Sequence, residues 1–157
     1  MHAVLDAILN KGGAGTTISR QETVDRINPL IEAHARLLHA YASVQQSLPP
    51  ESLPSGLNEH LRTARMDVGK LAETVYSTGG VAYTGTDLEP GTERFEGGTA
   101  SVLKALAARE EEFLGQVRDE LKDVDHHIRT RAILGNVEKH TAERLDAVRE
   151  AARKARD

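Results

Sequence analysis

The stretch from Thr78 to Gly98 is the one long interruption in a chain that otherwise has helical periodicity, and it constrains the fold more than any other feature. It is rich in glycine and contains Pro90, and these residues deny it a regular helix. The segments on either side, about 19–77 and 99–157, each carry two helical patterns. The chain is therefore expected to fold as two helical hairpins joined by one long connection.

The composition favours an all-α domain. With 157 residues the chain is long enough to form one domain whose core needs no metal or disulfide to be stable. Aromatic residues make up only 3% and Trp is absent, so the helices are expected to pack through aliphatic side chains. Cys is also absent, which excludes a disulfide framework, a thiolate metal site and a cysteine nucleophile.

The charge pattern argues against nucleic-acid and membrane partners. The formal net charge is -4 and the two signs are interspersed, so no basic surface for nucleic acid or anionic lipid is expected. The N-terminal run has no cationic start and is too short and polar for a signal peptide or a membrane span. A cytoplasmic location is therefore expected.

The chain is expected to divide into an N-terminal arm with a glycine-rich linker, residues 1–18, and a bundle domain, residues 19–157. Val4, Leu5, Ile8 and Leu9 have the spacing of two turns of amphipathic helix. Two interpretations of the arm stay open. It either frays or docks on the bundle or a neighbouring subunit, or it serves as a targeting or partner-binding peptide.

The first hairpin is predicted from cap signals and prolines. Ser19 and Glu22 have the capping-box spacing, so the first helix is expected to begin there and to end near Leu48. Pro29 is expected to kink the first turns or to delay the start of this helix. Prolines follow Leu48, and the second helix is expected to open at Pro54 or Ser55 and to reach about Ser77.

The second hairpin is predicted in the same way. A third helix is expected from about Thr99 to Val124. Asp123 or Asp125 is expected to cap a fourth helix that begins near His126 and continues almost to the C-terminus. Within each hairpin the connection is short, so its two helices should be antiparallel neighbours.

The length of the central stretch permits a particular arrangement of the hairpins. A helix of about 27 residues is roughly 40 Å long, and an extended chain covers about 3.3 Å per residue. The stretch can therefore run the whole length of the bundle, on the outside, and make the second and third helices parallel. Short, long and short connections in this order are typical of the ferritin-like topology.

Two short segments add to that resemblance. The segment Ile27-Asn28-Pro29-Leu30-Ile31-Glu32 resembles the opening of the first helix in small bacterial ferritin-like proteins of unknown function, which are often linked to stress. The segment from Leu71 to Gly80 resembles the Leu-Gly-Gly helix ending common in such bundles. The chain thus resembles the ferritin-like superfamily, as a ferritin-like four-helix bundle with a long crossover between its second and third helices.

The resemblance directs attention to a metal site in the middle of the bundle. Metal-binding ferritin-like bundles take a Glu from each of two helices and Glu-x-x-His from the other two. Counting residues along the helices brings His34, Glu110 and either His140 or Thr141 to one level. The second predicted helix offers Leu61 and Ala64 where the family pattern requires Glu and His, so a di-iron centre is not expected.

Two interpretations of this level stay open. His34, Glu110 and His140, with Glu138 as a fourth ligand, form a chemically sensible set for one iron or zinc ion. The favoured alternative is a buried polar layer without cofactor, in which His34 and Glu110 pair with each other or with Arg65 and Thr141 and fix the helix register.

Three functional classes follow. The leading hypothesis is a non-enzymatic ferritin-like protein, linked to stress, that acts as a homo-oligomer, with Leu30, Leu37 and Leu114 as candidate subunit contacts. The first alternative is a metal-binding oxidoreductase or iron-handling protein. The second is a histidine phosphotransfer module, because His60 and the small residues after it, up to Gly69, loosely resemble the phosphorylated segment of such domains.

Overall fold

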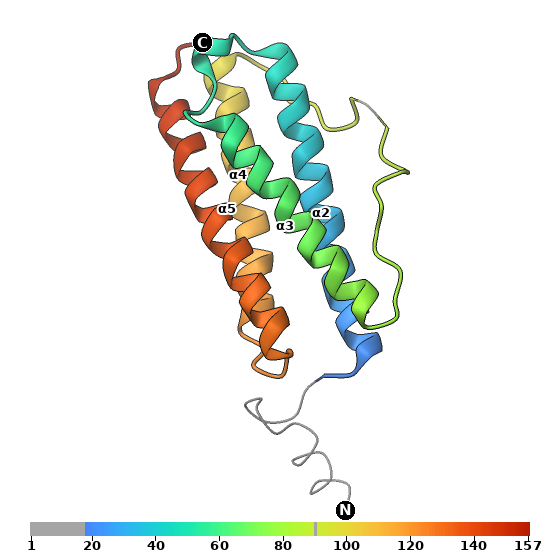
Figure 1. Ribbon diagram of the computed structural model, residues 1–157. Coiled ribbons are helices and arrows are strands. Elements are labelled where there is room, and N and C mark those ends of the chain that lie inside the picture. Colours follow the sequence, from blue (N-terminus) through green and yellow to red (C-terminus); the bar gives the residue numbers. More distant parts are fainter. Residues whose placement is uncertain (1–17, 90) are drawn as a thin grey trace, which may run out of the picture.

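The computed structural model describes residues 18–89 and 91–157 as a bundle of four α-helices (Figure 1). They are α2 (Arg20–Ser47), α3 (Leu57–Ser77), α4 (Thr99–Leu121) and α5 (Ile128–Lys154), with a short 3-10 helix, η1 (Pro50–Ser52). The described residues contain no strand, so the all-α four-helix bundle is confirmed. The predicted amphipathic arm falls in residues 1–17 and lies outside the described residues. None of the described helices is long and apolar enough to cross a membrane.

The four helices form a ring in which each has two neighbours. Helix α2 packs beside α3 and α4, and α5 also packs beside α3 and α4. The α4–α5 pair has the most extensive contact, whereas α2 and α4 have the least. Helices α2 and α5 therefore lie diagonally opposite each other in the bundle.

Helix α2 begins where the capping signal predicts. The Ser19 hydroxyl accepts a hydrogen bond from the Glu22 backbone N–H at 3.0 Å, which satisfies one of the N–H groups that a helix start leaves free. Pro29 lies inside the helix, which runs without a break from Arg20 to Ser47. The expected delay of the helix start is therefore wrong, because the cap at Ser19 secures the turns before the proline.

Helix α4 begins at Thr99 as predicted, whereas the starts of α3 and α5 differ by a few residues from the prediction. Helix α3 begins at Leu57, after Gly56 in the left-handed conformation with φ 69°, which glycine adopts without steric cost. The N-cap of α5 is His127, whose ring Nδ1 accepts from the Arg129 N–H. The expected cap by Asp123 or Asp125 is wrong, since Asp123 instead binds the Arg26 guanidinium on α2.

The central stretch passes along the outer side of α2. The Asn28 side chain donates to the Val81 carbonyl and accepts from the Tyr83 N–H, both at 2.9 Å. Further along, the Glu93 carboxylate lies 3.6 Å from Arg36 on α2 and 2.8 Å from Arg109 on α4. Figure 1 shows the segment leaving the lower end of α3 and returning to the upper end of the bundle, where α4 begins.

The core is mainly aliphatic, and its most completely buried polar residues lie near its middle. Fully buried residues include Ile27, Ile31, Leu71, Leu103, Leu106 and Leu134. Leu30, Leu37 and Leu114 are also buried, with 4%, 2% and 4% of their surface exposed. Their prediction as subunit contacts is therefore wrong, because the apolar stripes are wide enough to bury them within one chain.

Candidate functional site: a buried polar layer

Five polar side chains interrupt the aliphatic core near its middle and form what we call the polar layer. They are His34, Tyr41, Glu110, Thr141 and Arg144, and each has 1% or less of its surface exposed. They come from α2, α4 and α5, so the layer spans three of the four helices. The sequence predicted a polar level here with His34, Glu110 and Thr141, and the structure adds two members that were not expected there, Tyr41 and Arg144.

The centre of the layer is an ion pair between Arg144 and Glu110. The guanidinium donates to both carboxylate oxygens, from Nε to Oε1 and from Nη2 to Oε2 at 3.0 Å. This two-pronged geometry is the strongest arrangement for an arginine and a carboxylate. Burial disfavours the charged guanidinium, but the neighbouring Glu110 outweighs it and keeps the pKa of Arg144 above its ordinary value.

Tyr41 is the third member of this network. Its hydroxyl donates to Glu110 Oε1, and the Arg144 Cζ lies 6.0 Å from the centre of its ring, a distance at which a cation is attracted to an aromatic face. Burial and the adjacent carboxylate raise the pKa of the Tyr41 hydroxyl. Tyr41 therefore stays protonated and acts as a donor to the carboxylate.

His34 lies in the same layer, but its ring makes no hydrogen bond with the described residues. Its ring packs edge-on against Phe113, with 4.7 Å between the ring centres. Burial, and secondly the charge of Arg144, lower the pKa of His34 to about 3. The imidazole is therefore neutral at pH 7, and neither ring nitrogen finds a partner among the described residues.

Two other polar atoms of the layer have no hydrogen-bond partner among the described residues. Thr141 Oγ1 and Arg144 Nη1 are buried and make no hydrogen bond with the described residues. Buried polar groups are usually satisfied by protein or by ordered water. The layer thus holds donors and acceptors beyond those that the ion pair uses.

The four residues predicted as metal ligands do not converge. His34 and Glu110 both lie in the polar layer. His140 instead binds the Asp67 carboxylate of α3 through Nδ1, at 3.0 Å from Oδ2, and Glu138 binds Arg118 at 3.3 Å on the surface between α4 and α5. Within residues 18–89 and 91–157, no group of three His, Asp or Glu side chains is arranged to hold a metal ion.

Asp67 and Arg144 are two buried charged residues that the sequence analysis did not place in the core. Asp67 has 3% of its surface exposed, and burial raises the pKa of its carboxyl although the hydrogen bond from His140 opposes this. A signal for both was present. Asp67 follows Ala64 by three positions and Arg144 precedes Val148 by four, so both lie on the apolar stripes of their helices.

The second histidine hypothesis concerns His60. It lies in the first turn of α3 with its ring next to Gly56 and is half-buried. The polar layer comes from the other three helices, and no hydrogen bond among the described residues joins His60 to it.

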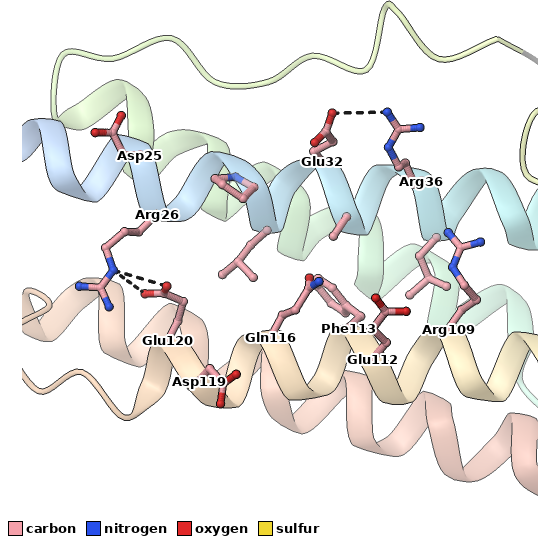
Figure 2. A pocket seen from close by; sticks show the side chains of 14 residues that line it. Asp25, Arg26, Glu32, Arg36, Arg109, Glu112, Phe113, Gln116, Asp119 and Glu120 are labelled. Carbon is pink, nitrogen blue, oxygen red and sulfur yellow. Dashed lines mark hydrogen bonds and ion pairs between the residues drawn. The ribbon is translucent and has the colours of Figure 1, made fainter.

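A groove between α2 and α4 opens above the layer. It has a volume of about 620 Å³, and its lining includes Leu30, Leu37 and Phe113. Figure 2 shows Phe113 and Gln116 rising from α4 toward α2 between rows of charged side chains. The arginines of the rim are neutralised within the protein, for example Arg26 by Glu120 at 3.1 Å. The groove therefore lies over Phe113, which separates it from His34.

Comparisons with protein-family models, with curated proteins and with solved structures find no match to this chain. Its function is therefore argued from the geometry alone.

Proposed function

We propose that the chain is a non-enzymatic ferritin-like four-helix bundle protein in which an internal ion pair stands where related bundles would hold metal. The observation that carries this proposal is the contact of Arg144 with both oxygens of Glu110 in the buried centre. The path of residues 78–98 along the outside of α2 supports the long crossover of that topology.

The charges of the polar layer oppose a metal ion at its centre. A ferritin-like metal site needs several carboxylates that converge on cations in the middle of the bundle. Here Glu110 is the only carboxylate in the polar layer, and the permanently charged guanidinium of Arg144 occupies both of its oxygens. A metal ion at this place would have to displace Arg144 and would be repelled by it. The layer is suited to fixing helix register rather than to redox chemistry.

One observation favours metal binding as a second candidate function. His34 presents two buried and unpartnered ring nitrogens, and its lowered pKa keeps the ring neutral, which is the form that binds metal. Iron or zinc could recruit His34 and Glu110 if Arg144 turned away. This alternative is an iron-handling or oxidoreductase role.

Metal analysis of protein purified without an affinity tag separates the two candidates. Iron and zinc are measured in the wild type after equilibration with each metal and removal of the excess. We expect well under one ion per chain, with no difference in the His34→Ala and Glu110→Ala variants. Stoichiometric metal that is lost in both variants but kept in Glu138→Ala, a surface control, would overturn the proposal.

We also propose that the protein self-associates through the outward face of α3. Met66 and Tyr76 are exposed on this face, at 59% and 55%. Ten positions correspond to about 80° of rotation on a helix, so the two side chains project from the same side of α3. The molar mass measured by light scattering should be that of a dimer or a larger oligomer, and Met66→Glu should reduce it to that of a monomer. A monomeric wild type would refute the proposed self-association.

A further inference from the structure

A hollow of about 810 Å³ lies at the end of the bundle where α2 begins, α3 ends and α5 begins. It is remote from the polar layer, and we call it the α3–α5 hollow. Arg20, Lys70 and Arg129 line it together with one carboxylate, Glu73. The rest of its wall is mainly hydroxyl-bearing and small apolar side chains. Its volume is in the range of small-molecule sites.

The three cations give the hollow a positive character in a protein whose formal charge is -4. None of the three makes an ion pair with the described residues, whereas the arginines of the α2–α4 groove are paired with carboxylates. Their side chains are exposed, so they are free to turn toward a bound group. Cations of one sign that gather around a hollow attract anions to it.

Thr130 provides a second and independent indication. It lines the hollow with only 6% of its surface exposed, and its hydroxyl has no hydrogen-bond partner among the described residues. Its backbone belongs to the first turn of α5, where His127 takes the N–H groups of Arg129 and Arg131. Among the described residues no acceptor is present for the Thr130 N–H group, which lies at the positive end of the helix dipole.

We infer that the α3–α5 hollow binds a small organic phosphate. Hydroxyl, backbone N–H and guanidinium donors that converge at a helix start are suited to a phosphate group. The hollow is much larger than phosphate alone, and Ile18 and Ile133 in its wall offer an apolar surface for the organic part. This inference is independent of the proposed function of the polar layer.

The test is a titration of the full chain, labelled with ¹⁵N, by inorganic phosphate and by phenyl phosphate at constant ionic strength and pH 7.5. We expect saturable shifts of the Thr130 and Ile128 amide signals with both probes. Phenyl phosphate should bind several-fold more tightly, because only it can use the apolar wall. Potassium chloride at the same ionic strength should leave these signals unchanged.

Charge-removing variants locate the site. Arg129→Gln should weaken phenyl phosphate binding by roughly two- to fivefold, as expected for one exposed cation, and Arg129→Gln with Lys70→Gln should weaken it further. Lys139→Gln, which removes an exposed charge from the same helix outside the hollow, should leave the affinity unchanged.

Three results would overturn the inference. They are shifts that chloride reproduces, an equal loss of affinity in the Lys139→Gln control, and equal affinity for the two phosphates. Since the substituted side chains are exposed, an unaltered circular dichroism melt should show that each variant folds.

Discussion

Replacing Arg144 by methionine tests the energetics of the polar layer most directly. The substitution keeps an unbranched side chain of similar length but leaves the Glu110 carboxylate fully buried with the Tyr41 hydroxyl as its remaining partner. Removing one member of a buried ion pair costs about 3–5 kcal/mol, because the other charge stays desolvated. A domain typically has about 5–15 kcal/mol of stability, so Arg144→Met should remove a large fraction of it.

Urea unfolding at pH 7, followed by circular dichroism at 222 nm, measures this loss from the transition midpoint and slope. The double variant Glu110→Leu with Arg144→Met removes both charges. It should be more stable than Arg144→Met alone, by about 2 kcal/mol or more, since no buried charge is left unpaired. An Arg144→Met variant within about 0.5 kcal/mol of the wild type, or a double variant that loses the sum of the two single losses, would refute this reasoning.

Three further predictions concern His34 and two local contacts. Because burial lowers the pKa of His34 from 6.5 to about 3, the unfolded chain binds a proton there that the folded chain does not, so stability is lost as pH falls below 6.5. His34 should contribute about 2 kcal/mol to this loss at pH 5. Urea unfolding of His34→Leu should therefore show a decrease in the free energy of unfolding between pH 7.5 and pH 5 that is smaller than the decrease in the wild type by this amount. An equal decrease in the two proteins would contradict the prediction. An alanine Cβ at Gly80 would overlap the Val24 side chain, so Gly80→Ala should destabilise by about 1–3 kcal/mol, whereas Gly69→Ala, in open space within α3, should stabilise by about 0.5–1 kcal/mol; thermal melts that reverse this order refute it. Asp157 accepts two N–H groups at the start of α4, so Asp157→Ala should cost about 1 kcal/mol, and an unchanged melting temperature would show that this cap is not formed in solution.

The helices were predictable because their signals are local. The Ser19 cap, the apolar periodicity and the prolines after Leu48 each act within a few residues, and together they placed α2 to within one residue at its start. The starts of α3 and α5 were less well placed. Gly56 and His127 are unusual N-caps, and the aspartates expected to cap α5 are partly used elsewhere, Asp123 by Arg26.

The polar layer was predicted only in part, because its pairing is not local. Counting along the helices correctly brought His34 and Glu110 into the buried centre. The same count on α5 reached His140 or Thr141, and the metal hypothesis took His140, whereas Thr141 is the residue that lies in the buried layer. One residue is about 100° of rotation on a helix, so His140 points toward Asp67 of α3 at the edge of the core.

The identity of the central cation depends on that rotation. Arg144 is one turn after Thr141 on the same face of α5, and it reaches Glu110 from the helix packed against α4. An arginine on an apolar stripe is usually taken to extend past the core into solvent. It is held inside here because Glu110 of α4 accepts two of its hydrogen bonds and the Tyr41 ring of α2 lies 6.0 Å from its Cζ. The sequence displays a carboxylate and a histidine, Glu110 and His34, that could hold a metal. We therefore expect the rotation of α5, which directs Arg144 to Glu110, to decide whether a layer of this kind binds metal.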